Sequence, residues 1–561
     1  MDTIHMSVPV RTWEAIHKAT TRPRNILCMG STDVRVDQRG IVMNGSESLV
    51  ATLVAEGVGI CFANPGTSEM HFLAALENPG LRSVLVLFEG IATGAADGWY
   101  RMSGHPASTL LHLGPGLANG LANLHNARRA GSGIVNIIGE HATAHLQYDP
   151  PLMSDIDGLA RPISHWVRRS SSSCELAGDT AAAIAQARSK PGRIATLILP
   201  GETSWGPAGE HVKPPSATDC RSSAKPKPPN MARVEQVAGI LRRGEPTLIV
   251  SGGQATRGRA VELLGRIAAH TGCRVATQFF SARIERGAGR APLERIPYFV
   301  PSALTFLNGF KNIITVETGE PIAFFSYPGS PSQLKPTDCV VHPLVLAEED
   351  SVAGLEMLID VLGAQKAEAV FQERTDVGVP QGRLDPTSIA RALTAAMPEN
   401  AILVDESLTT GRETLGLTAG ARPHDVLQNM GGSIGFGTPV ATGAALACPD
   451  RRVFCMVGDG SAMYTIQSLW SQARESLNVT TIIFANNSYQ ILKNEYANMG
   501  FGKPGPKASA MIDIDKPRID WVAMGKSMGC PSVRVDNAGD FYHSMVKSSE
   551  EPGPMLIEVC L

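Results

Sequence analysis

The stretch Val453–Tyr489 reads VFCMVGDGSAMYTIQSLWSQARESLNVTTIIFANNSY. Its two apolar runs, Val453–Val457 and Val479–Ala485, predict strands, and the amphipathic residues between them predict a helix. Such a unit joins two parallel strands that lie side by side, so the residues that follow each strand meet at the same edge of the sheet. Asp459 and Asn486, 27 residues apart, occupy those two positions. The pattern therefore predicts an α/β domain with a polar site at the carboxyl ends of its strands.

The turn after the first of these strands contains the groups that a metal and phosphate site needs. Asp459 supplies a carboxylate and Asn486 an amide oxygen, and with a backbone carbonyl these are the oxygens that suit Mg²⁺. Gly458 and Gly460 allow the backbone to approach a phosphate, and the N-terminus of the following helix favours an anion. The alternative is an ordinary strand–turn–helix in which Asp459 caps the helix. The matching position of Asn486 favours the metal site.

Length and composition limit the classes of protein to consider. A chain of 561 residues is too long for one core and predicts roughly three domains of about 150–200 residues. Hydrophobic residues make up 43% and charged residues 18%, and the net charge of −3 gives no support for a nucleic-acid surface. No apolar run approaches the roughly 20 residues of a membrane span. The ten cysteines form no C-x-x-C pair, which fits a reducing compartment. We therefore expect a cytoplasmic protein with no nucleic-acid or membrane partner.

Changes in composition divide the chain into segments. Residues 1–43 mix acidic and basic side chains without a helical stripe or a secretory apolar core. The stretch 213–230 is rich in proline, serine and lysine and marks the clearest boundary. The expected order is a flexible N-terminal extension at 1–43, a first domain at 44–212, a linker at 213–230, a central domain at 231–365, a linker at 366–384 and a third domain at 385–561.

Two strand ends of the first domain also carry polar side chains. The run Leu81–Phe88 predicts a strand buried on both faces and places Glu89 at its carboxyl end. The run Ser108–Leu113 predicts a second strand, and His112 stands near its end, just before Gly114-Pro115-Gly116 opens a helix. Both residues are candidates for a site. The alternatives are a solvated helix cap for Glu89 and a structural role for His112.

Two of these motifs together resemble the thiamine diphosphate-dependent enzymes. GDGS at 458–461 followed by NNSY at 486–489 resembles the family's diphosphate–magnesium motif, and FEGIATGAADGWYR at 88–101 resembles its pyrimidine-binding element. The resemblance covers roughly residues 44–561. It implies an α/β fold of three doubly wound parallel-sheet domains, namely a pyrimidine-binding, a central and a diphosphate-binding domain. It also implies thiamine diphosphate and Mg²⁺ as cofactors.

The resemblance assigns roles to individual residues. Glu89 would hydrogen-bond the pyrimidine nitrogen N1′, and Thr409 of the DESLTT segment would bind diphosphate oxygens. In the loop GGSIG, the Gly432 carbonyl would accept the pyrimidine amino group and Ile434 would wedge between the two rings. The other cofactor residues implied are Gly458, Asp459, Gly460, Ser461, Asn486 and Ser488, of which the Asp459 and Asn486 side chains and the Ser488 carbonyl would bind the metal.

The substrate side of the site resembles that of benzoylformate decarboxylases. The turn Asn64-Pro65-Gly66-Thr67 and the sequence Leu111-His112-Leu113 resemble their N-P-G-S and L-H-S elements, which makes Thr67 and His112 candidate catalytic residues. His112 would act as a proton shuttle. Ser326 stands where these enzymes carry a second histidine, so their pattern of proton delivery is not fully retained. Candidates for an apolar substrate wall, or equally for plain core, are Phe325, Ile491 and Leu492.

The resemblance predicts an enzyme that decarboxylates a 2-oxo acid through an enamine intermediate and releases an aldehyde. The alternative is an acetolactate synthase-like carboligase, which adds the enamine to a second carbonyl. A non-catalytic regulatory subunit is a third possibility, which the presence of Glu89 and Asp459 disfavours. Since those two acids lie on different domains and the family builds its site between two chains, we expect a homodimer or homotetramer. The central domain shows little of the flavin-binding sequence of acetolactate synthases, so FAD is not expected.

Overall fold

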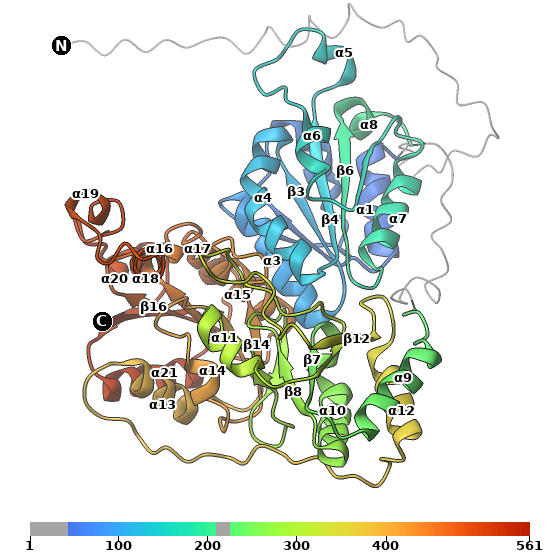
Figure 1. Ribbon diagram of the computed structural model, residues 1–561. Coiled ribbons are helices and arrows are strands. Elements are labelled where there is room, and N and C mark those ends of the chain that lie inside the picture. Colours follow the sequence, from blue (N-terminus) through green and yellow to red (C-terminus); the bar gives the residue numbers. More distant parts are fainter. Residues whose placement is uncertain (1–42, 209–224) are drawn as a thin grey trace, which may run out of the picture.

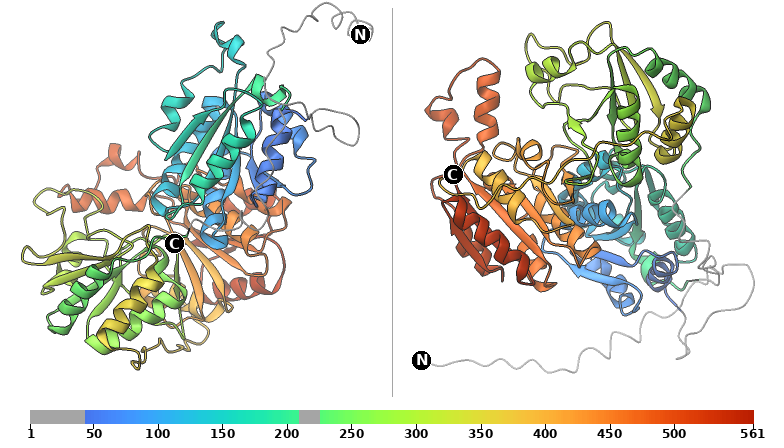
Figure 2. Two further views of the ribbon diagram at one scale, coloured as in Figure 1. Left: turned by 90° about the vertical axis from the view of Figure 1, so that its right-hand side faces the viewer. Right: turned by 90° about the horizontal axis from the view of Figure 1, so that it is seen from below.

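The computed structural model describes residues 43–208 and 225–561. It holds three α/β units, each with its own sheet (Figure 1), and two further views show each unit lying against the other two (Figure 2). The predicted extension at 1–43, apart from its last residue, and most of the predicted linker at 213–230 lie outside the described residues. Within the described part, no helix combines the length and the hydropathy needed to cross a bilayer.

The first unit contains a six-stranded sheet in which all strand pairs are parallel. Its strands are β1 (Ile60–Ala63), β2 (Arg82–Leu85), β3 (Ala107–Leu111), β4 (Ile134–Glu140), β5 (Trp166–Arg169) and β6 (Ile194–Pro200), and its helices are α1 (Gly45–Ala55), η1 (Thr67–Glu69), α2 (Met70–Ala75), α3 (Glu89–Ser103), α4 (Leu113–Ala130), α5 (Thr143–Leu146), α6 (Ile156–Ala160), α7 (Leu176–Ala187) and α8 (Gly201–Trp205). The strand order is β2-β1-β3-β4-β6-β5.

One prediction about this sheet is wrong. The run Leu81–Phe88 forms only the short strand β2, and Arg82 and Ser83 are exposed rather than buried on both faces. The reason is that β2 is the edge strand and has β1 as its single neighbour in the sheet. An apolar run therefore did not distinguish an edge strand from a central one.

The central unit contains a five-stranded sheet in the order β10-β8-β7-β11-β12, again with parallel pairs. Its strands are β7 (Thr247–Ser251), β8 (Arg274–Thr277), β10 (Glu294–Arg295), β11 (Asn312–Val316) and β12 (Val340–Val345), and its helices are α9 (Met231–Arg242), η2 (Gly253–Thr256), α10 (Gly258–Thr271), α11 (Val300–Leu307) and α12 (Ser351–Leu362).

The third unit contains a seven-stranded sheet in the order β17-β18-β16-β15-β13-β14-β9. Its strands are β9 (Ile284–Arg286), β13 (Ala401–Glu406), β14 (His424–Gln428), β15 (Val453–Gly458), β16 (Val479–Ala485), β17 (Ser532–Val535) and β18 (Met555–Cys560), and its helices are α13 (Pro386–Ala396), α14 (Thr414–Leu417), α15 (Gly437–Ala447), α16 (Asp459–Ala462), α17 (Ser468–Arg474), α18 (Gln490–Asn498), α19 (Pro506–Ser509), α20 (Trp521–Ser527) and α21 (Ala538–Glu550).

Strand β9 departs from the parallel pattern. It lies within the range predicted for the central domain, 231–365, yet it pairs antiparallel with β14 of the third unit, with Ile284 opposite Val426. The central and third units are therefore joined through a shared sheet edge. The remaining strands of the third sheet are parallel.

The pairing of β15 with β16 confirms the prediction made from residues Val453–Tyr489. The two strands are parallel and in register, from Val453 opposite Val479 to Gly458 opposite Phe484. Asp459 and Asn486 thus follow neighbouring strands at the same edge of the sheet.

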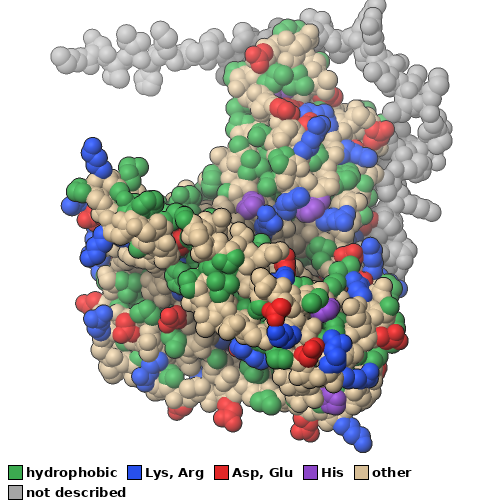
Figure 3. Space-filling view, in the orientation of Figure 1, with side chains coloured by type: hydrophobic (Ala, Val, Ile, Leu, Met, Phe, Trp, Pro, Cys, Tyr) green, Lys and Arg blue, Asp and Glu red, His purple; other side chains and the backbone are tan. Residues whose placement is uncertain are grey.

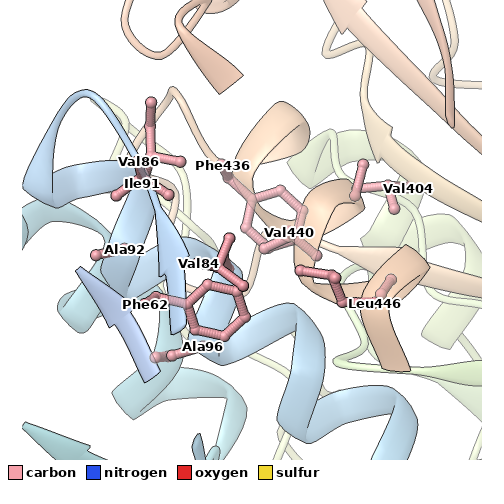
Figure 4. Close-up of a cluster of buried hydrophobic side chains, with 14 of the residues drawn as sticks. Phe62, Val84, Val86, Ile91, Ala92, Ala96, Val404, Phe436, Val440 and Leu446 are labelled. Atoms are coloured by element: carbon pink, nitrogen blue, oxygen red, sulfur yellow. The ribbon is translucent and has the colours of Figure 1, made fainter. Parts of the chain in front are cut away.

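Helices α3 and α15 connect the first and third units through closely approaching backbones. A Cβ atom on Gly98 would lie 2.1 Å from the Val440 carbonyl oxygen, and one on Gly443 would lie 1.9 Å from the Ala95 carbonyl oxygen. Each glycine therefore makes room for the backbone of the other helix. The buried cluster at this contact (Figure 4) combines Phe62, Val84, Val86, Ile91, Ala92 and Ala96 of the first unit with Val404, Phe436, Val440 and Leu446 of the third.

Replacing Gly98 with valine is expected to lower the free energy of unfolding by about 1–3 kcal/mol, because the added atoms must displace the α15 backbone. The control is Gly239→Ala in α9, where an added Cβ meets no atom within 4 Å. That substitution should raise stability by about 0.5–1 kcal/mol, since it removes a glycine from a helix interior. Unfolding followed by circular dichroism measures both, and a Gly98→Val protein as stable as the wild type would contradict the close packing.

Candidate functional site

A pocket opens at the carboxyl ends of β13, β15 and β16. Its lining residues are Ser407, Leu408, Thr409, Thr410, Gly458, Asp459, Gly460, Ser461, Phe484, Asn486, Ser488, Tyr489, Gln490 and Ile491. The structure thus brings together seven of the residues predicted to hold the cofactor and metal, from three separate turns. Among the described residues, the lining comes from the third unit alone. Glu89, Thr67 and His112 of the first unit, and Gly432 and Ile434 of the third, lie outside it.

Asp459 is the one acid among the described residues that line this pocket, and 2% of its surface is exposed. Its Oδ1 accepts a hydrogen bond from the Gly460 N–H at 2.8 Å, and its Oδ2 accepts one from the Asn487 N–H at 2.5 Å. Burial raises the pKa of Asp459, and the backbone N–H groups act in the opposite direction. A cation next to this carboxylate would stabilise its charged form. The donor set therefore fits a divalent metal.

The turn Asn486-Asn487-Ser488 holds the second group of oxygens. The Asn486 side-chain oxygen accepts a hydrogen bond from the Ser488 N–H at 3.0 Å, and the Ser488 hydroxyl donates to Asp513 at 3.0 Å. Asn487 adopts a left-handed conformation with φ of 56°. Non-glycine residues with positive φ are uncommon and concentrate at functional sites. The N–H of this residue donates to Asp459, so the turn and the carboxylate are fixed relative to each other.

The absence of a side chain has a different consequence at each of the two glycines of the GDGS turn. A Cβ on Gly460 would lie 2.4 Å from the ring of Tyr489, so this position has no room for a side chain. A Cβ on Gly458 would meet no atom within 4 Å, although Gly458 lines the pocket. Free space beside Gly458 is consistent with the predicted approach of a phosphate. At position 460, in contrast, glycine is required because the Tyr489 ring fills the space of a side chain.

The loop Gly431–Gly435 lies against α4 of the first unit. Asn126 donates to the Ser433 carbonyl at 2.9 Å and accepts from the Ser433 N–H at 3.1 Å. Gly432 has a φ of 76°, and a Cβ there would lie 2.6 Å from the Phe324 ring of the central unit. The half-buried Ile434 follows Ser433 in this loop. The loop is thus clamped where three units meet, and the roles predicted for Gly432 and Ile434 stay predictions.

Glu406, the last residue of β13, fixes the far end of this loop. Its buried carboxylate accepts hydrogen bonds from the N–H groups of Gly435, Phe436 and Gly437 at 2.8, 3.0 and 2.6 Å. Burial raises its pKa to about 7, although the three N–H donors act to lower it. This role of Glu406 was not predicted from the sequence. The available signal was an acid in the DESLTT segment directly after a strand of apolar residues.

Glu89 occupies the first turn of α3 and is 7% exposed. Its Oε2 accepts a hydrogen bond from the Asn119 side chain of α4 at 3.0 Å. A Cβ on Gly116, also in α4, would lie 3.1 Å from its Oε1. The alternative of a solvated helix cap is therefore wrong, because the carboxylate is enclosed between α3 and α4.

His112 forms a pair with a buried acid, Glu69, that was not among the predicted site residues. Its Nδ1 lies 2.8 Å from Oε2 of Glu69, which is 1% exposed and also accepts the Gly66 N–H at 2.8 Å. The Ser68 hydroxyl lies 3.2 Å from the same nitrogen and donates to Glu69 at 2.6 Å. The hydroxyl next to His112 thus belongs to Ser68, whereas the predicted Thr67 is exposed. The sequence contained a signal for this pair, because the acid Glu69 follows the N-P-G-T turn by two residues.

Apolar side chains lie exposed around the segment that follows the pocket. Figure 3 shows them gathered where Figure 1 places α18 and α19, and they include Leu492, Met499, Phe501 and Met511. Of the three residues proposed for an apolar substrate wall, Ile491 lines the pocket, whereas Phe325 and Leu492 are 51% and 47% exposed. The alternative that Phe325 and Leu492 are core residues is therefore wrong.

Comparison with known proteins identifies the family. A family model described as the thiamine pyrophosphate enzyme N-terminal TPP binding domain matches residues 43–160, and the corresponding C-terminal TPP binding domain matches residues 414–559. The IlvX protein of Mycobacterium tuberculosis, provisionally named an acetolactate synthase large subunit, is 48% identical over 92% of this chain and 99% of its own length. The chain belongs to the thiamine diphosphate (thiamine pyrophosphate) enzymes.

The proteins similar to this thiamine diphosphate enzyme are named for two different reactions. Benzoylformate decarboxylase of Pseudomonas aeruginosa is 25% identical over 90% of this chain and 96% of its own length. The solved structure of a 4-hydroxybenzoylformate decarboxylase from Rhodococcus jostii RHA1 has the same fold, with a TM-score of 0.76, 23% identity, and coverage of 92% of this chain and 98% of the other. The enzyme is thus related to both decarboxylases and acetolactate synthases, and its three-unit α/β fold is that of the family.

The pH dependence of the free energy of unfolding tests whether the pKa of the Glu406 carboxyl is raised in the folded enzyme. Because its folded-state pKa of about 7 lies above the ordinary 4.5, its contribution is fully present below pH 4.5 and is lost as the pH rises through 7. Between these values the free energy of unfolding should fall by up to about 3 kcal/mol from this group. Glu406→Gln should lack that component of the slope. The control Glu399→Gln, an exposed residue just before β13, should keep it, and an unchanged slope in Glu406→Gln would contradict the assignment.

Proposed function

We propose that this thiamine diphosphate enzyme decarboxylates a 2-oxo acid and releases the corresponding aldehyde, as benzoylformate decarboxylases do. The observation that carries the proposal is the His112–Glu69 pair, with Nδ1 2.8 Å from Oε2. Release of an aldehyde requires a proton to reach the carbon that has lost CO₂, and a histidine held by a buried carboxylate suits that transfer.

The geometry around His112 favours one tautomer. An ionised carboxylate can only accept hydrogen bonds, so Nδ1 donates to Glu69 and Nε2 is left to exchange a proton with substrate. A Cβ on Gly66 would lie 2.2 Å from Nδ1, so a side chain there would displace the ring. Glu69 and Gly66 would together orient His112, which remains 21% exposed toward solvent.

The cofactor chemistry would use the two acids on different units. Thiamine diphosphate, when bound, supplies a nucleophilic carbon and an electron sink for the loss of CO₂. Glu89, enclosed and held by Asn119, would hold a proton at the pyrimidine nitrogen. Asp459, Asn486 and the Ser488 carbonyl would bind Mg²⁺, which commonly takes few protein ligands beside substrate phosphates. In keeping with a site of that kind, no group of three or more His, Cys, Asp or Glu residues in the described part could hold a metal.

A second candidate function is carboligation, in which a second carbonyl compound replaces the proton as acceptor. It is favoured by the 48% identity to IlvX of Mycobacterium tuberculosis, since that name implies an acetolactate synthase large subunit. Ser326 also stands where benzoylformate decarboxylases carry their second histidine. Both candidates share the decarboxylation step and differ in the fate of the product.

The active site would be completed by a second copy of the chain. In support, the described residues that line the diphosphate pocket come from the third unit, whereas Glu89 and His112 lie on the first. The exposed apolar residues Leu492, Phe501 and Met511 next to the pocket would be covered in such an assembly. We therefore propose a homodimer or a homotetramer built from it.

We also propose that the enzyme works without FAD. At the turn after β7, where a phosphate-binding α/β unit would offer its backbone N–H groups, the Glu317 carboxylate accepts the Gln254 N–H at 3.1 Å. Glu317 is also paired with Lys190 at 2.8 Å, and a Cβ on Gly253 would lie 2.2 Å from its Oε2. An acidic side chain already occupies the position that a dinucleotide phosphate would need.

A product assay tests the reaction. Purified enzyme with thiamine diphosphate and Mg²⁺ is incubated with pyruvate, benzoylformate or a branched 2-oxo acid, and with EDTA in place of Mg²⁺ as a control for the metal. We expect free aldehyde and CO₂, whereas acetohydroxy acid or acyloin would establish the ligase. Glu89→Ala should lower kcat by about 10²-fold or more, while replacement of Glu77, an exposed residue just after α2, by alanine should not. Full activity of Glu89→Ala, or of the EDTA sample, would refute the corresponding assignment.

Mixed assemblies test whether the site lies between chains. Glu89→Ala and Asp459→Asn proteins, each inactive alone, are co-expressed with different tags and the doubly tagged species is purified. If the sites form between chains, each mixed dimer has one site with both native residues and one site with neither, so the doubly tagged dimer should have about half of the wild-type activity. If each site lies within one chain, every site carries one substitution and no activity returns.

A further inference from the structure

A larger cavity, of about 640 Å³, lies between the central and third units. Its walls come from β9, β10 and the start of α11 on one side and from α14 on the other, and Figure 1 shows α11 and α14 close together. It shares no lining residue with the diphosphate pocket. Nothing in the decarboxylation site described above uses this cavity.

Four arginines line the cavity: Arg286, Arg290, Arg295 and Arg412. The side chain of Arg286 donates to the Thr418 hydroxyl at 3.1 Å and to the Leu415 carbonyl, and that of Arg295 donates to the Arg412 carbonyl. These acceptors are uncharged. Among the residues that the structure describes, none of the four guanidinium groups has a carboxylate within ion-pair distance.

The acids of the cavity wall do not neutralise this charge. Glu294 is held by Arg274 at 2.5 Å, and Glu285 accepts from Arg283 at 3.2 Å and from the Gly258 N–H at 2.8 Å. Both carboxylates are thus engaged by cationic or N–H groups that do not line the cavity. The third acid, Glu413, is exposed.

Burial makes this group of cations costly in the absence of an anion. Burial, with a contribution from Arg295, lowers the pKa of Arg286 to about 10, and burial also lowers the pKa values of Arg295 and Arg412. The charge of Asp405 acts in the opposite direction on Arg295, and that of Glu495 does so on Arg412. The Nε of Arg412 is buried without a hydrogen-bond partner. Aromatic faces carry part of the charge, with Arg295 4.4 Å from the Phe279 ring centroid and Arg412 4.4 Å from that of Phe299. An anion between the guanidinium groups would supply the missing acceptors.

We propose that this cavity binds a phosphorylated organic anion of nucleotide size. Planar guanidinium groups match phosphate oxygens in bidentate geometry, which is why arginine predominates in such sites. The volume lies within the roughly 300–1,000 Å³ of small-molecule pockets, and inorganic phosphate alone would fill only a small part of it. Aromatic side chains of Phe279, Tyr298 and Phe299 in the wall provide surface for the organic part.

The bound anion would act as an effector of the cofactor site. Residues 407–410 line the diphosphate pocket, and the next residues of the same segment, Arg412 and Glu413, line the arginine cavity. The Arg412 N–H donates to the Thr409 carbonyl at 3.3 Å, so a ligand that moves Arg412 acts directly on the turn that carries Thr409. Binding at one site then changes affinity at the other by the same factor in both directions.

Calorimetric titration with ATP, and with inorganic phosphate for comparison, tests the binding site. The full chain is first saturated with thiamine diphosphate and Mg²⁺, so that ATP cannot enter the diphosphate pocket. We expect one ATP per chain and much weaker binding of phosphate. Arg290→Met, at an exposed position of the cavity wall, and Arg412→Met should each weaken ATP binding about tenfold. Arg243→Met, an exposed arginine of the same unit outside the cavity, should not.

Absence of ATP binding, or equal affinity in Arg290→Met and the wild type, would overturn the site. Because Arg290 is exposed, that variant retains the fold even if Arg412→Met does not. The effector role is measured as the Kd of thiamine diphosphate with and without saturating ATP, in the wild type and in Arg290→Met. We expect a change of threefold or more in the wild type that is lost in Arg290→Met. A constant Kd in the wild type, or the same change in both proteins as simple competition at the diphosphate pocket would give, would overturn it. Neither readout involves turnover, so the inference stands or fails separately from the proposed decarboxylation.

Discussion

The hydrogen bond from the Asn487 N–H to the Asp459 carboxylate joins two turns that are 28 residues apart in sequence. It forms because β15 and β16 are adjacent, parallel and in register, so both turns leave the sheet at the same level. Asn487, which donates this hydrogen bond, has a left-handed conformation. With the turn fixed in this way, Asn486, Ser488 and the GDGS turn line one pocket. Without that pairing, the residues of the pocket would have no common location.

Buried carboxylates organise the surroundings of this pocket. Asp459 binds two backbone N–H groups, Glu406 binds three, and Glu69 binds one together with the His112 ring. An ionised group withdrawn from water is unfavourable unless its acceptor capacity is used, so each of these acids constrains the segment that satisfies it. The loop after β14, the turn after β16 and the N-P-G-T turn are therefore held rigidly. Such preorganisation suits an enzyme that must place a cofactor and a substrate accurately.

The three units are joined to one another by two different kinds of contact. The shared core of α3 and α15 holds the first and third units together, and the antiparallel strand β9 connects the central unit to the third sheet. The central unit thereby contacts the segment that carries Thr409, on the side where the arginine cavity lies. The limits of the individual domains and the cytoplasmic location stay predictions.

The sequence by itself indicated the family, through the resemblance of its motifs, and it predicted the parallel α/β fold and seven of the residues that line the pocket at the ends of β13, β15 and β16. This was possible because strand–turn–helix motifs are local, and the order of residues in them reports which side chains reach the edge of the sheet. Thr409, Asp459 and Asn486 could be placed on that basis. Tertiary structure decided what local patterns do not encode. It placed β2 at an edge, took β9 from the central range into the third sheet, and paired Glu69 with His112 and Glu406 with the loop after β14. Each of these depends on contacts between segments distant in sequence, where burial and hydrogen bonding rather than spacing select the partner.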